Sequence, residues 1–226
     1  MGADTLTVTA VAAAALFAAV GAGAERLASV WPADEASRRA PGIRTLLLAA
    51  AAALGGGAIA ARSSLPPWAL GVQLLVLGML VVLTATDVEQ RRLPHVLLDP
   101  LIVVAVLFVP FNPTVPWSSA LLGAAAGLAF MGALGLIVRG GVALGDLFLV
   151  VPLGLVLGWP AIFVAMFVAG LLSAAVSIGL LVTRQAGLKS YIPFVPFLVA
   201  GAVVALVRDP ALLGSAAAAM SGLLRA

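Results

Sequence analysis

Two aspartates, Asp87 and Asp146, stand where the residue pattern favours chemistry. Asp87 closes a long apolar stretch, and Asp146 follows Gly145 directly before another apolar run. Ionisable side chains near a membrane are costly, so they are candidates for function. Two carboxylates about 3 Å apart hold a single proton between them, so that one acts as a base on water while the other donates to a carbonyl oxygen. If the two aspartates meet, the pair has the chemistry of an aspartic protease.

Each of these aspartates also has a structural interpretation. Asp146 is at a position where it would cap a helix by accepting bonds from first-turn amides. Asp87 is followed by Arg91 and Arg92, so its other interpretation is a charge at the membrane interface beside these arginines. Gly145 would let the backbone approach whatever Asp146 faces.

The other acids and the single histidine have simpler interpretations. Asp99 precedes Pro100 early in an apolar stretch, which favours a buried polar contact or a first-turn cap. Glu89 and His95 are most simply solvated loop residues. The remaining acids are expected in solvated loops or tails: Asp4, Glu25, Asp34, Glu35 and Asp209.

Composition excludes several other chemistries. The chain has no cysteine and one histidine, so disulfides, thiolate metal sites and zinc proteases with a His-Glu-x-x-His motif are excluded. We therefore expect no metal and no cofactor. The net charge is +3, but the basic residues are scattered and form no stripe, which argues against a nucleic-acid partner.

The elements that must position the aspartates are membrane helices. Hydrophobic residues make up 63% of the chain and charged residues 9%, far fewer than the roughly 25% of a soluble domain. We expect an all-α polytopic bundle in the lipid bilayer, forming one integral membrane domain over 1–226. A spanning helix needs roughly 20 apolar residues. The expected spans are Thr5–Ala24, Ile43–Ala61, Pro67–Thr86, Val96–Phe111, Ser118–Val138, Leu147–Gly158, Ala161–Thr183 and Pro193–Val207.

The basic residues predict how this bundle is oriented. With eight spans and the N-terminus outside, nine of the twelve Lys and Arg residues fall in inside loops. Basic residues favour cytoplasmic loops. Both aspartates are thus expected at cytoplasmic helix ends. The sequence makes no prediction of the oligomeric state.

Three segments resemble the type IV prepilin peptidases, which are membrane aspartyl enzymes of bacteria. The first is Asp87–Leu101, with a basic loop and a Leu-Pro after the aspartate. The second is Ala143–Leu149, followed by Leu-Gly and Leu-Gly-Trp. The third is Ile192–Leu198, with its Ile-Pro-Phe-Val-Pro-Phe. Their order and spacing match the family over residues 80 to 205.

The resemblance implies an eight-helix fold in the bacterial inner membrane with its catalytic aspartates at the cytoplasmic face. It implies that Asp87 and Asp146 are the catalytic pair, with Gly145 as the glycine of close approach. The implied activity is cleavage of a prepilin-like precursor after the glycine that ends its basic leader. The peptidase core would lie at about 67–207.

The sequence departs from the family at several positions. Ala143 replaces a glycine, Phe148 a lysine, and Val195 a glycine. A Cys-rich cytoplasmic domain of the larger members is missing from the segment 25–42, so we expect a peptidase without methyltransferase activity. Two alternatives stay open: a small transporter or channel, or an inactive family member in a pilus or secretion assembly.

Overall fold

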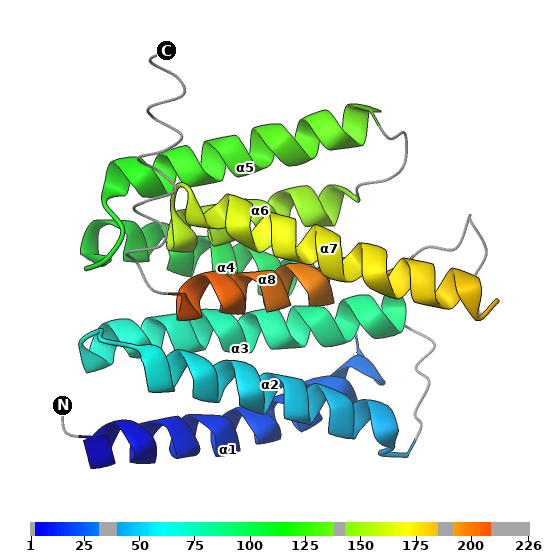
Figure 1. The fold of residues 1–226 in the computed structure, drawn as a ribbon, viewed down its shortest axis with the longest axis horizontal. Helices are drawn as coiled ribbons and strands as arrows, with labels where there is room; N and C mark the ends of the chain where they lie inside the picture. The colour runs from blue at the N-terminus through cyan, green and yellow to red at the C-terminus, as the bar shows by residue number, and fades with distance from the viewer. Residues whose placement is uncertain (1–2, 32–39, 138–142, 185–191, 209–226) are drawn as a thin grey trace.

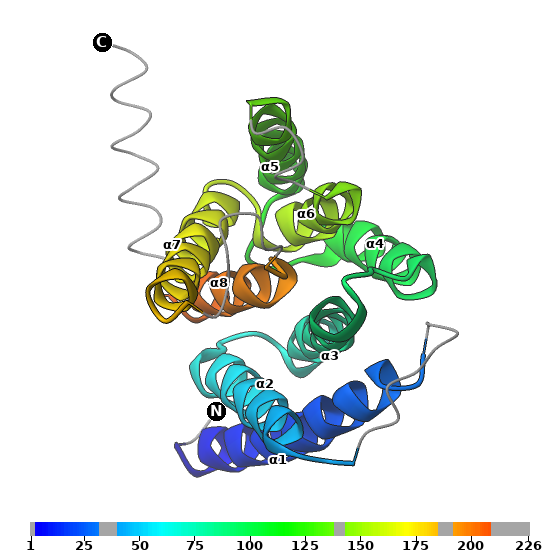
Figure 2. The same cartoon turned by 90° about the vertical axis from the view of Figure 1, so that its right-hand side faces the viewer.

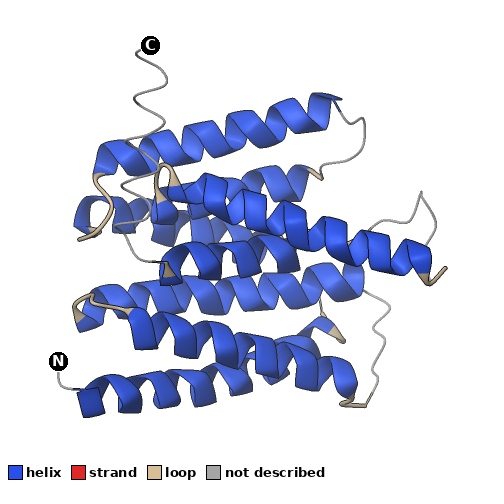
Figure 3. Ribbon diagram, in the orientation of Figure 1, coloured by secondary structure: helices blue, strands red, loops and turns tan. Residues whose placement is uncertain are grey.

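A computed structural model describes residues 3–31, 40–137, 143–184 and 192–208, and within these ranges the chain forms helices joined by turns and loops, with no strand (Figure 1, Figure 3). The expected all-α class is confirmed. The helices are α1 (Ala3–Ala28), α2 (Ile43–Arg62), α3 (Pro67–Gln90), α4 (His95–Phe108), the 3-10 turn η1 (Val109–Phe111), α5 (Trp117–Ile137), α6 (Leu144–Leu157), α7 (Ala161–Val182) and α8 (Val195–Val207).

Successive helices run in opposite directions, which gives the bundle two ends (Figure 1). The connections α1–α2, α3–α4, α5–α6 and α7–α8 lie at one end, together with Asp87 and Asp146, and we call it the aspartate end. The connections α2–α3, α4–α5 and α6–α7 lie at the opposite end. The two aspartates, 59 positions apart in the chain, therefore share one end of the bundle.

Five of the described helices, α1, α2, α3, α5 and α7, are long and apolar enough to cross a membrane. The other three, α4, α6 and α8, have 13 or 14 residues each, and thus measure about 20 Å at 1.5 Å per residue. Most of the residues of α6 are buried. α6 is therefore largely surrounded by protein, where a helix need not match the bilayer thickness, whereas α4 exposes Val103 and Leu107 on its outer side.

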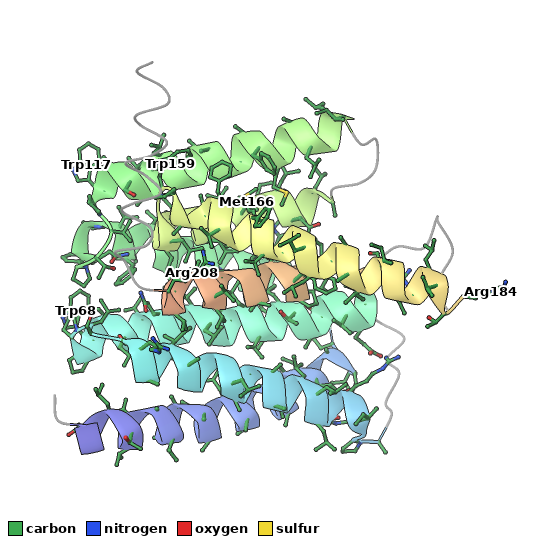
Figure 4. The ribbon with its side chains drawn as sticks, in the orientation of Figure 1. Trp68, Trp117, Trp159, Met166, Arg184 and Arg208 are labelled. Carbon is green, nitrogen blue, oxygen red and sulfur yellow. The ribbon has the colours of Figure 1, made fainter. Side chains whose placement is uncertain are left out.

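The outer surface of the bundle is as apolar as its core. Leu54 of α2 and Leu136 of α5 are 75% and 83% exposed. Trp68 and Trp117 lie at the opposite end, whereas Arg184 lies at the aspartate end (Figure 4). Apolar flanks with tryptophans near a membrane–water interface are typical of a protein in a bilayer. The chain is a multi-pass membrane protein.

Close helix contacts hold the second half of the bundle together. A Cβ on Gly154 of α6 would lie 2.5 Å from the Cα of Ala124 of α5. A Cβ on Gly201 of α8 would overlap the carbonyl oxygen of Ala165 in α7. Small residues let helix backbones approach closely where lipid removes the hydrophobic drive for association. These contacts fix α6 and α8, the helices that lie beside the aspartates.

Candidate active site

Asp87 and Asp146 are both buried at the aspartate end, with 3% and 4% of their surface exposed. Asp87 lies in the last turns of α3, and Asp146 is the third residue of α6. Seen from this end, α4 and α8 flank the pair of helices that carry the aspartates (Figure 2). The side chain of Asp87 is buried within the bundle instead of facing the surrounding solvent.

The carboxylate of Asp87 accepts a hydrogen bond from the backbone N–H of Val195, with Oδ2 at 3.2 Å from the nitrogen. Val195 is the first residue of α8, so this N–H has no acceptor within its own helix. Asp87 thus caps α8 from another helix, where the positive end of the helix dipole favours a negative charge. The bond joins the first and third of the three resembling segments.

Asp146 does not cap its own helix. The residue at the N-cap of α6 is Ala143, and the N–H of Asp146 itself bonds to the Ala143 carbonyl at 3.0 Å. The N-cap interpretation of Asp146 is therefore wrong, since α6 begins three residues earlier than the expected span. Its carboxyl group lies near the backbone N–H of Ala143, in the first turn of a helix whose dipole favours a negative charge.

The two carboxyl groups act on each other. The charge of Asp87 reaches Asp146 electrostatically, and neither forms an ion pair within the described ranges. Two like charges that are buried near one another favour a state with one shared proton. In the same ranges no three His, Cys, Asp or Glu side chains gather in a way that would hold a metal ion.

Gly145 brings α6 against the loop that follows Asp87. A Cβ on Gly145 would lie 2.8 Å from Cδ1 of Leu93 and 3.3 Å from its Cβ. Leu93 belongs to the connection between α3 and α4. The glycine thus allows a close approach to the side chain of Leu93.

We predict that Gly145→Ala slows peptide cleavage about fivefold to tenfold, because the added methyl pushes Leu93 and displaces Asp146. The double variant Gly145→Ala/Leu93→Ala is expected to recover most of the rate. Gly132→Ala is the control, since its Cβ would have no neighbour nearer than 3.8 Å. Initial rates of precursor cleavage measure all three, and a rate that Leu93→Ala fails to restore would contradict this account.

The positions that depart from the family pattern fit the fold. Ala143 has φ −77° and ψ 148°, an extended conformation that needs no glycine. Phe148 is 48% exposed and lies with its ring 6.0 Å from that of His95. Val195 is fully buried and still donates its N–H to Asp87. None of the three blocks the pair of aspartates.

Several expectations about the other acids are wrong. The side chain of Asp99 is 67% exposed and lies 3.2 Å from Nδ1 of His95, so it is neither a buried contact nor a cap. Glu25 belongs to α1, which extends to Ala28, and is 5% exposed. Glu89 belongs to α3, and its side chain is 11% exposed. Asp4 lies in the first turn of α1, whereas Asp34, Glu35 and Asp209 lie outside the described residues.

Glu25 and Glu89 are part of a polar cluster that joins α1, α2 and α3. The hydroxyl of Thr45 donates to Oε2 of Glu25 at 2.7 Å. Arg44 lies 3.6 Å from Glu89, and the side-chain amide of Gln90 donates to the Ala28 carbonyl at 2.6 Å. Burial of these carboxylates is possible because such partners are present.

Sequence reasoning missed the main-chain amide of Val195 as a partner of Asp87. The available signal was the proline at position 196, which is favoured in the first turn of a helix and so placed the helix start beside Val195. The sequence does not show which side chain accepts this N–H, because Asp87 and Val195 are 108 positions apart and come together only when the helices pack.

The fold and the site together define a polytopic helical membrane protein with an acidic pair at one end of the bundle. Residues 74–178 match the sequence model of the Type IV leader peptidase family. The matched segment, to which the chain is similar over this range, includes both aspartates. No solved structure shows a significant match to the chain.

Curated relatives carry the name prepilin leader peptidase/N-methyltransferase. One from Bacillus subtilis is 29% identical over 57% of this chain and 52% of its own length. One from Aeromonas salmonicida is 32% identical over 66% of this chain and 53% of its own length. One from Aeromonas hydrophila is 32% identical over 65% of this chain and 52% of its own length. The chain thus spans about half the length of the curated relatives that it matches.

Proposed function

We propose that this protein is a membrane aspartic endopeptidase that cleaves the leader from prepilin-like precursors, with Asp87 and Asp146 as its catalytic pair. The observation that carries the proposal is the burial of two aspartates, from α3 and α6, at one end of a membrane bundle and close enough for their charges to interact. Their match to the leader peptidase family supports it. A transporter would need its acids near the middle of the membrane, and these lie at one end.

In the proposed reaction, water attacks the carbonyl carbon of the scissile peptide bond. The ionised aspartate takes a proton from the water, and the protonated one donates its proton to the carbonyl oxygen. The tetrahedral diol then collapses: its C–N bond breaks, the leaving amine receives the proton taken from the water, and one hydroxyl of the diol returns its proton to the donor aspartate as the C=O bond reforms. Both carboxyl groups return to their starting state, and no metal or cofactor takes part.

The surroundings of the pair suggest which aspartate starts out ionised. Asp87 accepts the N–H of Val195 at the start of α8, and a bond of this kind stabilises the charged form of a carboxylate. We therefore assign Asp87 as the base and Asp146 as the proton donor. Asp146 lies in the first turn of α6, and the negative charge of Asp87 nearby favours its protonated form.

We also propose that the aspartate end faces the cytoplasm of a bacterial cell, with the N-terminus outside and the protein in the inner membrane. Five described arginines lie at the aspartate end and two at the opposite end. This distribution favours a cytoplasmic aspartate end. The catalytic core would be the segment 67–207. We propose peptidase activity without N-methylation, which mass spectrometry of the new N-terminus would test.

Cleavage of a precursor tests the proposal directly. The purified protein in lipid vesicles would be mixed with a precursor that has a basic leader, a glycine and an apolar helix. The expected result is a shorter product cut after the glycine, formed by wild type and by Asp99→Asn but not by Asp87→Asn. Asp99 is a suitable control because it is an exposed acid at the same end. No product from wild type would argue for an inactive member.

A further inference from the structure

A lateral groove of about 650 Å³ runs between α2, α3 and α8, and it takes no part in the chemistry described so far. Most of the side chains that line it are apolar. The charged residues in its lining are Glu25, Arg44 and Glu89, and all of them lie at the aspartate end. The groove is therefore polar at one end and apolar along the rest of its length.

The length of the groove suits a helix. Along α2 it extends from Arg44 to Ala58, and along α3 from Glu89 back to Leu77. The α2 segment corresponds to about 21 Å at 1.5 Å per residue, which is roughly two thirds of the hydrocarbon thickness of a bilayer. An apolar helix of about 14 residues would fill it.

The groove and the aspartates are neighbours, because the last turns of α3 and the first turn of α8 contribute residues to both. Val88 lines the groove and directly follows Asp87 in α3. Pro196 lines the groove, and its neighbour Val195 donates to Asp87. A peptide that leaves the groove at the aspartate end therefore needs only a few extended residues, at about 3.5 Å each, to reach the carboxylates.

The lining favours a peptide over a lipid chain. Ala51 and Gly55 on α2, and Ala200 on α8, leave room for the backbone of another helix to come close.

The polar end of the groove, at Glu25, Arg44 and Glu89, is called its mouth, and its charges suit a basic segment of a ligand. Glu25 and Glu89 are largely buried, whereas their arginine partners Arg26 and Arg44 have side chains that are 35% and 62% exposed. The two pairs are long, at 3.8 and 3.6 Å, and the arginine side chains extend toward solvent. Two buried carboxylates at this end of the groove can attract the basic residues of a leader.

We propose that this groove is the docking site for the apolar helix of the precursor, with the basic leader at Glu25 and Glu89. The proposal rests on the proposed function for the identity of the precursor. It assigns substrate selection to α2 and the α2-facing sides of α3 and α8, away from the aspartates themselves.

Cross-linking tests the docking separately from catalysis. The chain has no cysteine, so single cysteines can be introduced without background. Leu47→Cys and Leu54→Cys place a thiol in the groove at exposed positions. Ile178→Cys on α7 and Val106→Cys on α4 are exposed controls at matched distances from the aspartate end. Each variant would be oxidised in vesicles with a precursor that has one cysteine in its apolar helix.

We expect disulfide-linked adducts from the two groove positions and at least tenfold less from the two controls. Groove adducts without cleavage would support the docking site and overturn the peptidase. Cleavage with no groove preference would overturn the docking site and assign the groove to lipid. Neither adducts nor cleavage would overturn both proposals.

A blocking substitution gives a second measurement. Ala51 is exposed to the groove, so Ala51→Phe fills it without entering the core, and Ala129→Phe does the same on the exposed side of α5. Ala51→Phe is expected to slow cleavage of the full precursor about tenfold or more while a short soluble peptide with the same scissile bond is cut at the wild-type rate. Equal precursor rates for the two variants would overturn the docking site.

The acidic mouth has its own test. Glu89→Gln is expected to reduce the preference for a precursor with a basic leader over one with a neutral leader about threefold or more, whereas Asp99→Asn leaves it unchanged. An unchanged preference in Glu89→Gln would remove the mouth from the proposal.

Discussion

Asp87→Asn and Asp146→Asn are each expected to lower the rate of precursor cleavage by at least roughly 1,000-fold, while the protein stays folded. Asparagine has nearly the shape of aspartate, and its amide oxygen can still accept the N–H of Val195. It can neither take a proton from water nor donate one from a carboxyl group. The measurement is the single-turnover rate in vesicles, with thermal unfolding followed in parallel.

The double variant Asp87→Asn/Asp146→Asn distinguishes a working pair from two independent contributions. Residues that act as a unit show non-additive losses, so the double variant should be little slower than either single variant. Multiplied losses would mean that the aspartates act separately. The control is Asp99→Asn, which should retain the wild-type rate because its side chain lies 67% exposed beside His95. A single aspartate variant that keeps its rate would identify that residue as structural.

Gly201→Ala is expected to destabilise the protein by about 1–3 kcal/mol, the usual cost of overpacking a well-packed contact. The added Cβ overlaps the carbonyl oxygen of Ala165, a backbone atom that cannot move aside as the end of a side chain would. Because α8 would be pushed away from α7, the start of α8 at Val195 should also shift from Asp87 and lower the cleavage rate.

Gly170→Ala is the matched control for this prediction. It lies in α7, and a Cβ there would have no neighbour within 4 Å. Alanine also favours helix over glycine by about 1 kcal/mol, so this variant should be as stable as wild type or more so. The free energy of unfolding in mixed micelles measures both variants. A Gly201→Ala protein as stable as Gly170→Ala would show that α7 and α8 are packed less closely.

The sequence by itself determined the helical membrane class and the order of the helices. Apolar stretches separated by short polar connections predict membrane-spanning helices, because in lipid each backbone amide of such a segment must bond within its own helix. The alternation of helices then placed Asp87 and Asp146 at the same end. The use of these aspartates in catalysis stays a prediction that the variants above would test.

Only the tertiary structure decided what the acidic side chains contact. Asp99 looked buried and is exposed, whereas Glu25 and Glu89 looked solvated and are largely buried. Each helix of this chain is apolar on nearly every side, so its sequence does not show which face meets lipid and which meets protein. That choice depends on the rotation of each helix against its neighbours. The same rotation brings the amide of Val195 to Asp87 and opens the groove beside it.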